Sequence, residues 1–259
     1  MLELNNISKR FDGVNALAGL SLKIQPGQIT ALIGPNGSGK TTAFNIISGF
    51  LKPNEGEVIF KRLNLTGLKP FIIARSGIGR TFQNIRLFPQ ISVLDNVLLA
   101  LKYPRGEKLW PAIIRAKNML QEESVNIEKA RGLLNFVGLL DKQAVFAEQM
   151  SHGQRRLLEL ARALALDPEL LLLDEPFAGL SPTMVKQMKE HIENIRDKGK
   201  TVLFISHDMD VVMDIADRVI VLNHGRKIAD ETPAAIQQNE AVLTAYLGKI
   251  HSLEGPTND

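Results

Sequence analysis

The first part of the chain alternates apolar and polar residues in the way that is typical of short strands. This alternation runs over residues 2–4 and 20–24, and a turn at Pro26-Gly27 follows it. The apolar run Ile29–Ile33 then predicts a buried strand, and Thr41–Phe50 carries apolar residues at helical spacing. We therefore expect a strand, a glycine-rich loop and a helix in that order.

The rest of the chain alternates predicted helices with apolar runs that are short enough to be strands. Helical spacing predicts helices at Val93–Leu101, Trp110–Leu120, Ile127–Val137, Leu157–Leu166, Pro182–Arg196 and Val211–Ala216. Short apolar runs predict strands at Val58–Phe60, Leu170–Leu173, Thr201–Ile205 and Val219–Leu222. A wholly apolar run such as Leu170–Leu173 is typical of a parallel strand that is buried on both faces.

Strands that alternate with helices indicate an α/β fold with a mostly parallel sheet, here preceded by an N-terminal antiparallel β part. We expect a single domain over residues 1–259. Residues 1–90 and 155–250 are expected to form its α/β core with the β subdomain, and residues 91–154 a helical subdomain inserted into that core. The tail, residues 251–259, is expected to be disordered.

The composition is that of an ordinary globular protein and excludes several kinds of chemistry. Hydrophobic residues make up 44% and charged residues 23%, and the net charge of +3 is too small to indicate a class of partner. The absence of cysteine excludes disulfides, zinc–thiolate sites and thiol nucleophiles. No apolar run approaches the roughly 18 residues of a membrane span, and the first residues lack the pattern of a secretory signal. We therefore expect a soluble cytoplasmic protein that only other chains could hold at a membrane.

A glycine-rich segment matches the phosphate-loop pattern G-x-x-x-x-G-K-[ST] between a predicted strand and a predicted helix. Its glycines let backbone N–H groups converge on phosphates, and the amino end of the helix adds its positive dipole. Lys40 supplies a point charge for the β- and γ-phosphates, and the Thr41 hydroxyl can bind Mg²⁺. An incidental glycine-rich turn is the alternative, which the flanking elements disfavour. We predict a phosphate-loop NTPase core that binds ATP through Gly34, Pro35, Asn36, Gly37, Ser38, Gly39, Lys40, Thr41 and Thr42.

Two carboxylates, Asp174 and Glu175, follow the predicted strand Leu170–Leu173. Ligands of open α/β sheets bind at the carboxyl ends of the strands, so this position suits chemistry on a nucleotide. Asp174 would hold Mg²⁺, and Glu175 would orient and polarise the water that attacks the γ-phosphorus. A plain polar strand exit is the alternative, and the phosphate loop in the same chain disfavours it.

With the further motif Ser151-His152-Gly153-Gln154-Arg155, the chain resembles the ATP-binding subunits of ABC transporters over nearly its whole length. These five residues resemble the signature motif of that family. From the residues alone, Ser151 is a helix N-cap and Ser151-x-x-Gln154 is a capping box, and a capped helix terminus also attracts anions. The resemblance implies that Ser151, Gly153 and Gln154 bind the γ-phosphate of an ATP held by a second subunit. Two ATP molecules would then lie between the subunits of a head-to-tail dimer.

The same resemblance implies roles for four further residues. Phe11 would stack on the adenine with Ala16 as a small contact nearby, Gln83 would contact Mg²⁺ and the attacking water, and His207 would contact the γ-phosphate as a switch. Taken alone, Phe11, Ala16 and His207 are more often structural residues. The implied catalytic residues are Glu175, His207, Gln83 and Lys40, and the implied Mg²⁺ ligands are Thr41, Gln83 and Asp174.

Two motifs depart from the family pattern. The signature has Met150 and His152 where Leu and Gly are commonest, although the N–H of residue 152 and the close approach at Gly153 remain. The loop Ala178–Ser181, which the resemblance places across the dimer interface, ends in Ser181 where many members have Asp. The resemblance therefore leaves open how the two nucleotide sites communicate.

Within the family, the chain resembles the ATPase subunits of branched-chain amino-acid importers. The resemblance lies in Gly79–Phe88, Tyr103–Gln149, His152 and Ala245–Gly248, whereas Ser206 departs because that branch often has an acidic residue there. The implied partners are integral membrane permease subunits and a second ATPase subunit, either a copy or a sister chain. The implied location is peripheral, on the cytoplasmic side of the cell membrane. ATPases of urea and lipopolysaccharide systems are the alternatives, because the transported molecule does not touch this chain.

Two other classes compete with a transport ATPase. Nucleic-acid machines with this cassette carry long coiled coils or two cassettes, and the sequence has no heptads, no room for a second cassette and no basic stripe interleaved with aromatics. We therefore expect no nucleic-acid partner. A phosphate-loop kinase would need a substrate lid and has no use for the signature residues. Co-purification distinguishes a transport ATPase from a nucleic-acid machine. Membrane proteins are expected to co-purify with the former, and RNA or DNA with the latter.

Overall fold

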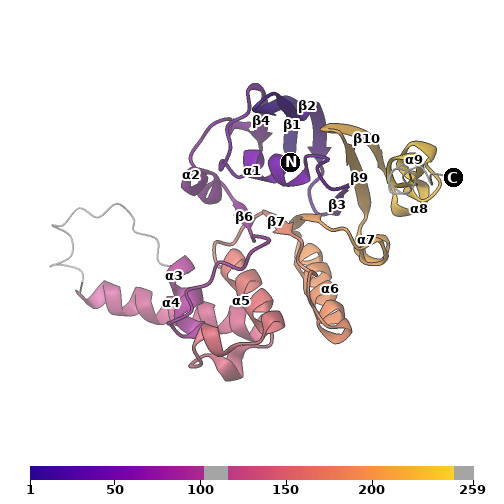
Figure 1. Cartoon of the computed structure of the whole chain (residues 1–259). Helices are drawn as coiled ribbons and strands as arrows, with labels where there is room; N and C mark the ends of the chain where they lie inside the picture. Colours follow the sequence, from indigo (N-terminus) through magenta and orange to yellow (C-terminus); the bar gives the residue numbers. More distant parts are fainter. Residues whose placement is uncertain (102–115, 248–259) are drawn as a thin grey trace.

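The computed structural model describes residues 1–101 and 116–247, in which an antiparallel sheet lies beside a mostly parallel one (Figure 1). Predictions that fall on residues 102–115 and 248–259 lie outside the described residues. They include the first part of the helix Trp110–Leu120 and the disordered tail.

The antiparallel sheet has the strand order β2-β1-β4-β5. Its strands are β1 (Leu2–Phe11), β2 (Val14–Ile24), β4 (Glu55–Phe60) and β5 (Leu63–Asn64). The prediction of short strands was wrong for β1 and β2, which are long neighbours joined by a tight turn. Register shifts between Leu4 and Phe11 interrupt the alternation of β1, so the sequence pattern shows only part of each strand.

The second sheet has the strand order β10-β9-β3-β8-β7-β6, and only the β10–β9 pair in it is antiparallel. Its strands are β3 (Ile29–Ile33), β6 (Ile78–Arg80), β7 (Leu170–Asp174), β8 (Thr201–Ile205), β9 (Arg218–Asn223) and β10 (Arg226–Glu231). Every residue of β3, β7 and β8 is buried. The predicted α/β fold with a mostly parallel sheet and an N-terminal antiparallel part is confirmed.

Two hydrophobic cores lie on opposite faces of the parallel sheet. Leu170 and Leu172 of β7 belong to the core shared with the antiparallel sheet, whereas Leu171 and Leu173 belong to the core on the other face. This is why the strand is apolar at every position. Helix α1 (Lys40–Ile47) packs against β2 and β7 in the first core, and α6 (Pro182–Asp197) packs against β3 and β8 in the second. The smaller helices are α2 (Pro70–Arg75), α7 (Met209–Ile215), α8 (Pro233–Ile236) and α9 (Glu240–Leu247).

Helices α3 (Val93–Leu101), α4 (Ala116–Phe136) and α5 (His152–Leu164) pack against one another, away from the antiparallel sheet (Figure 1). Two 3-10 turns, Leu140–Lys142 and Ala147–Gln149, connect α4 to α5. The segments predicted as separate helices before and after residue 121 form one helix from Ala116 onward, because residues 121–126 include no Gly or Pro. In the described ranges, no helix combines the length and apolar character that a bilayer span requires.

Candidate functional site

The carboxyl ends of three neighbouring strands bring the predicted motifs to one edge of the parallel sheet. Leu32 of β3 lies opposite Ile205 of β8, and Ile205 lies opposite Asp174 of β7. The phosphate loop begins two residues after Leu32, the acidic pair begins at Asp174 itself, and His207 lies two residues after Ile205. Strand register therefore places three segments that are far apart in sequence at the position where α/β proteins bind ligands.

The phosphate loop needs glycine at the two places where its backbone approaches other backbone. Gly34 has φ of 144°, and a Cβ there would lie 2.0 Å from the carbonyl oxygen of Leu222. Gly39 has φ of 103°, and its Cβ would lie 2.6 Å from the carbonyl oxygen of Ala16. Gly39 is also the N-cap of α1, so the cap position has no side chain to take up the first amides of the helix. The loop thus presents backbone donors at a positive helix terminus.

The ammonium group of Lys40 is directed into this loop. Its Nζ donates to the carbonyl oxygens of Gly34 at 2.7 Å and Pro35 at 3.0 Å, and to the Ser38 hydroxyl at 3.4 Å. The side chain is buried, whereas Thr41 beside it is exposed. A positive charge and a hydroxyl therefore lie side by side at the start of α1, which is the arrangement expected for a phosphate and its metal ion.

The C-terminal helix α9 lies beside the same loop, which the sequence did not predict. A cavity of about 700 Å³ is lined by residues 35–38, by Asn223 and His224, and by α9. Burial raises the pKa of the Tyr246 hydroxyl, and hydrogen bonding from the backbone of Gly34 lowers it in part. In the sequence, the Ala245–Gly248 segment indicates only a subfamily, and no local pattern predicts its contact with the phosphate loop.

The structure brings Glu175 and His207 together. The Nδ1 atom of His207 lies 3.3 Å from Oε2 of Glu175, and the Glu175 amide donates to the carbonyl of Ile205. Glu175 has φ of 50°, a left-handed conformation that non-glycine residues rarely adopt and that costs on the order of 1–3 kcal/mol. Strain of this kind is typical of functional sites, and here it lies at the residue that follows the buried strand β7.

Asp174 is held from the neighbouring strand by residues that the sequence did not single out. Its amide donates to the Thr81 hydroxyl at 3.4 Å, and its Oδ2 accepts from Arg80 at 3.1 Å. Burial raises the pKa of the Asp174 carboxyl, and the guanidinium of Arg80 lowers it in part. The only indication of Arg80 in the sequence is its place within the Gly79–Phe88 segment.

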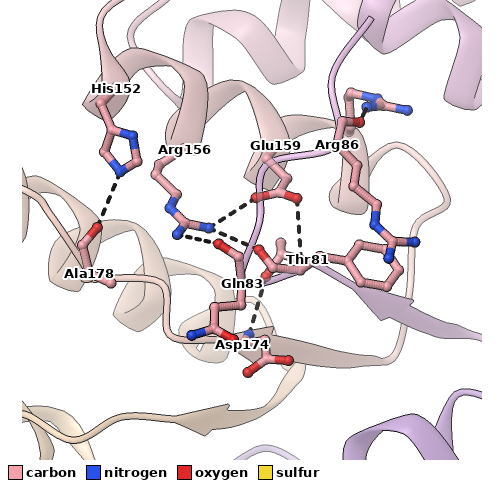
Figure 2. Close-up of polar contacts among 10 residues, drawn as sticks. Thr81, Gln83, Arg86, His152, Arg156, Glu159, Asp174 and Ala178 are labelled. Atoms are coloured by element: carbon pink, nitrogen blue, oxygen red, sulfur yellow. Dashed lines mark hydrogen bonds and ion pairs between the residues drawn. The ribbon is translucent and has the colours of Figure 1, made fainter. Parts of the chain in front are cut away.

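Gln83 is exposed in the irregular segment that follows β6. Arg156 and Glu159 of α5 hold the backbone of this segment, as Figure 2 shows. Neither was predicted as a site residue. Their three-residue spacing, continued at Arg162, places all three on one face of the helix, which is a signal that the sequence did contain.

The signature residues lie at the amino end of α5. The predicted capping box is confirmed, because the Ser151 hydroxyl accepts from the Gln154 amide and the Gln154 side chain accepts from the Ser151 amide. Ser151 is exposed, and its hydroxyl accepts its hydrogen bond from Gln154 within the capping box. Gly153 approaches Met184, since a Cβ there would lie 2.9 Å from its Cε.

Two residues that depart from the family pattern, His152 and Ser181, both make contacts within the chain. His152 lies 3.3 Å from the carbonyl oxygen of Ala178 through its Nε2, which links α5 to the loop after β7 (Figure 2). Ser181 is the N-cap of α6, and its side chain accepts from the Met184 amide at 3.4 Å. Serine and aspartate are both good N-caps, so the substitution keeps the start of the helix.

Phe11 and Ala16 flank the β1–β2 turn. Phe11 is 42% exposed, which leaves its ring available to stack on a planar ligand. The carbonyl of Ala16 lies beside Gly39 of the phosphate loop. The structure thus places the hairpin of β1 and β2 next to the loop.

The oxygen atoms at this edge fit a magnesium ion that arrives with a nucleotide. Thr41, Gln83 and Asp174, the predicted ligands, would supply hydroxyl, amide and carboxylate oxygens, and Mg²⁺ prefers one or two carboxylates together with substrate phosphates. Among the residues that the structure describes, no group of three or more His, Cys, Asp or Glu side chains could hold a metal ion by itself. The donor set therefore suits Mg²⁺ bound jointly with phosphates better than a resident metal centre.

Comparison with known proteins agrees with this geometry. Residues 17–178 match the family model described as ABC transporter. The chain is 39% identical over 250 residues to the high-affinity branched-chain amino acid transport ATP-binding protein LivG of Escherichia coli K12, covering 96% of this chain and 98% of LivG.

Solved structures give the same picture. An ATP-binding cassette of an ABC transporter in its ADP conformation aligns with a TM-score of 0.82 at 33% identity, covering 96% of this chain and 98% of that one. A dimeric cassette in a post-hydrolysis state, bound to ADP and Pi, aligns with a TM-score of 0.75 at 28% identity over 90% of this chain and 99% of that one.

Proposed function

This chain belongs to the ABC transporter family as an ATP-binding subunit, and from that premise we propose that its ATPase activity powers the import of branched-chain amino acids through membrane permease partners. The observation that carries the proposal is the alignment of the phosphate loop, Asp174, Glu175 and His207 at one sheet edge. The likeness to LivG over nearly the whole chain supports the substrate class.

ATP would bind with its phosphates in the loop Gly34–Thr42. The backbone amides and Lys40 would hold the β- and γ-phosphates. Hydrogen bonds to the loop carbonyls of Gly34 and Pro35 already direct the Lys40 ammonium group into the loop. The exposed ring of Phe11 would stack on the adenine with Ala16 nearby. Thr41, Gln83 and Asp174 would hold Mg²⁺, which when bound neutralises charge on the β- and γ-phosphate oxygens.

Glu175 would orient the attacking water and accept its proton. His207 lies within hydrogen-bonding reach of the Glu175 carboxylate, so it can fix the direction of that group and contact the γ-phosphate on its other side. The left-handed backbone at Glu175 would restrict the positions that its carboxylate can take. A positioned base of this kind contributes roughly 10²- to 10⁴-fold to a rate.

A second ATPase subunit, a copy of this chain or a sister, would complete the site. Ser151, Gly153 and Gln154 lie at the exposed amino end of α5, where a capped helix terminus can hold the γ-phosphate of the other subunit. Two bound ATP molecules would close a head-to-tail dimer, and hydrolysis would reopen it through repulsion between ADP and phosphate. The closure would drive the permeases from the cytoplasmic face of the membrane, where this subunit would be peripheral.

The ATPase role is tested by Glu175→Gln in the native complex isolated from membranes. Turnover should fall by about 10²-fold or more while ATP still binds, because the variant loses the base and keeps the phosphate loop. As an isolated chain, the variant should also accumulate an ATP-bound dimer that light scattering detects. Glu169→Gln, at an exposed carboxylate on another surface, is the control and should keep the parent rate. Parent-level turnover in Glu175→Gln would contradict the assignment.

The substrate class is tested by uptake in cells that lack the gene and carry either the parent chain or Glu175→Gln. Only the parent should restore uptake of radiolabelled leucine. Restoration of urea uptake instead, or lipopolysaccharide permeases in the isolated complex, would assign the subunit to one of the related systems. Co-purified RNA or DNA would favour a nucleic-acid machine.

A further inference from the structure

The segment Thr81–Arg86 leaves the parallel sheet without entering a helix or a strand, so its backbone groups need other partners. The guanidinium of Arg156 supplies two of them. Nη1 donates to the carbonyl oxygen of Phe82 at 2.9 Å, and Nη2 donates to that of Gln83 at 2.6 Å. The rigid planar fork of an arginine reaches the two carbonyls with two separate nitrogens, whereas a lysine would have to reach both with one nitrogen.

Glu159 completes this contact from the next turn of α5. Its Oε1 accepts from the Phe82 amide at 3.2 Å, and its Oε2 pairs with Arg156 at 3.4 Å (Figure 2). Both side chains are almost completely buried, at 6% and 7% exposed. A buried guanidinium needs an opposite charge, so Glu159 both binds the segment and allows Arg156 to lie there.

A third residue on the same face of α5 holds the end of the segment. Arg162 donates to the carbonyl oxygen of Arg86, and the guanidinium of Arg86 lies 3.9 Å from the centre of the Phe82 ring. One helix therefore holds the segment near its start, at Phe82 and Gln83, and at its end, at Arg86. Gln83 lies between these contacts, with its carbonyl bonded and its side chain exposed.

We propose that Arg156 and Glu159 are positioning residues that fix the backbone of Gln83 to α5, the helix that begins at the signature residue Ser151. The inference rests on the proposed function, in which Gln83 contacts the attacking water. Because Ser151 and Arg156 lie about 7.5 Å apart along one helix, any movement of α5 toward a second subunit carries Gln83 with it. Engagement of the signature would thereby set the position of Gln83 in the same chain.

A double-mutant cycle with Arg156→Lys and Gln83→Ala tests the inference in the native complex. Arg156→Lys should lower kcat by about 10-fold, the lower end of the effect of partners that orient a reacting group, and should leave the KM for ATP within about twofold. In the Gln83→Ala background the same change should have no further effect, because the residue it positions is gone. Arg131→Lys, at an exposed arginine of α4, is the matched control and should leave kcat unchanged.

Two outcomes of the cycle would overturn the inference. Equal losses from Arg156→Lys in both backgrounds would mean that Arg156 acts elsewhere, and an unchanged kcat in the single variant would remove its role altogether. Parent-level turnover in Gln83→Ala would instead contradict the proposed role of Gln83 itself, so the two failures are distinguishable.

Hydrogen exchange of the full chain gives a readout that is independent of turnover. Amides of residues 81–86 should exchange faster in Arg156→Lys, while those of β7 should not change. If that variant fails to fold, Glu159→Gln replaces it in the same cycle, because the amide oxygen can still accept from Phe82 while the charge paired with Arg156 is lost. Parent-like exchange in residues 81–86 in the folded variant would contradict the positioning role.

Discussion

The guanidinium of Arg80 lies 3.1 Å from the carboxylate of Asp174, and the two side chains are only 7% and 3% exposed. Arg80 also donates to the Ser48 hydroxyl at 2.5 Å, and its guanidinium lies 4.9 Å from the centre of the Phe82 ring and 5.6 Å from that of Phe50. Burial lowers the pKa of Arg80, and Asp174 partly offsets this. The acidic residue proposed to hold magnesium thus depends on a cation at the end of the neighbouring strand.

Removing one member of this pair should destabilise the fold. Arg80→Met is expected to lower the free energy of unfolding by about 3–5 kcal/mol, because it leaves the Asp174 charge buried without a partner. Adding Asp174→Asn should recover much of that loss, since the double variant buries no unpaired charge. Urea unfolding measures both, and Arg131→Met on the surface should change stability by less than about 0.5 kcal/mol. Equal stability of Arg80→Met and the parent would show that the pair is not coupled to folding.

Lys40→Ala should weaken ATP binding directly. Hydrogen bonds to a charged group contribute about 1.5–3 kcal/mol, so the Kd for ATP should rise by roughly 10- to 100-fold. Calorimetric titration of the isolated chain measures the change. Lys129→Ala, at an exposed lysine of α4, removes the same charge elsewhere and should leave the affinity unchanged. An unchanged affinity in Lys40→Ala would count against the whole phosphate-loop assignment.

Ser151→Ala should leave ATP binding by a single subunit intact and prevent closure of the dimer. The isolated chain should bind ATP with the parent affinity, whereas ATP-dependent dimerisation should be lost, because the hydroxyl is proposed to contact the nucleotide of the other subunit. The variant also loses a helix cap, which costs about 0.5–2 kcal/mol of stability. Ser92→Ala is the control for that cost, since the Ser92 hydroxyl accepts from the Asp95 amide at the start of α3. Equal loss of affinity in the isolated chain would argue against a site shared between subunits.

The burial of Glu159 gives a dependence of stability on pH. Burial raises the pKa of its carboxyl, and the Phe82 amide and Arg156 offset this only in part. The folded protein therefore holds this proton more tightly than the unfolded chain does. The resulting stabilisation is complete below the unfolded pKa of about 4.3 and is lost as the pH rises through the folded pKa.

The free energy of unfolding of the parent, minus that of Glu159→Gln, should consequently fall as the pH rises above about 4. Urea unfolding at a series of pH values measures this difference. A difference that grows with pH would mean that Arg156 stabilises the carboxylate more than burial disfavours it.

Much of the fold and most of the candidate site follow from local patterns. The strands β3, β7 and β8 are apolar at nearly every position because both of their faces are buried, so they can be recognised without a structure. The phosphate loop needs its glycines for reasons of backbone geometry, and the capping box at Ser151 is a four-residue pattern. These features are determined by residues that are close in sequence.

The partners of the reacting groups were decided only by the tertiary structure. Arg80 meets Asp174 because β6 and β7 are paired, and Arg156 meets Gln83 because α5 packs beside the segment after β6. Such contacts join residues that are 70 or more positions apart, and their energy depends on burial, which a sequence pattern does not contain. The sequence by itself thus determined which groups can bind a nucleotide, and the packing of strands and helices determined which buried charges hold those groups in place.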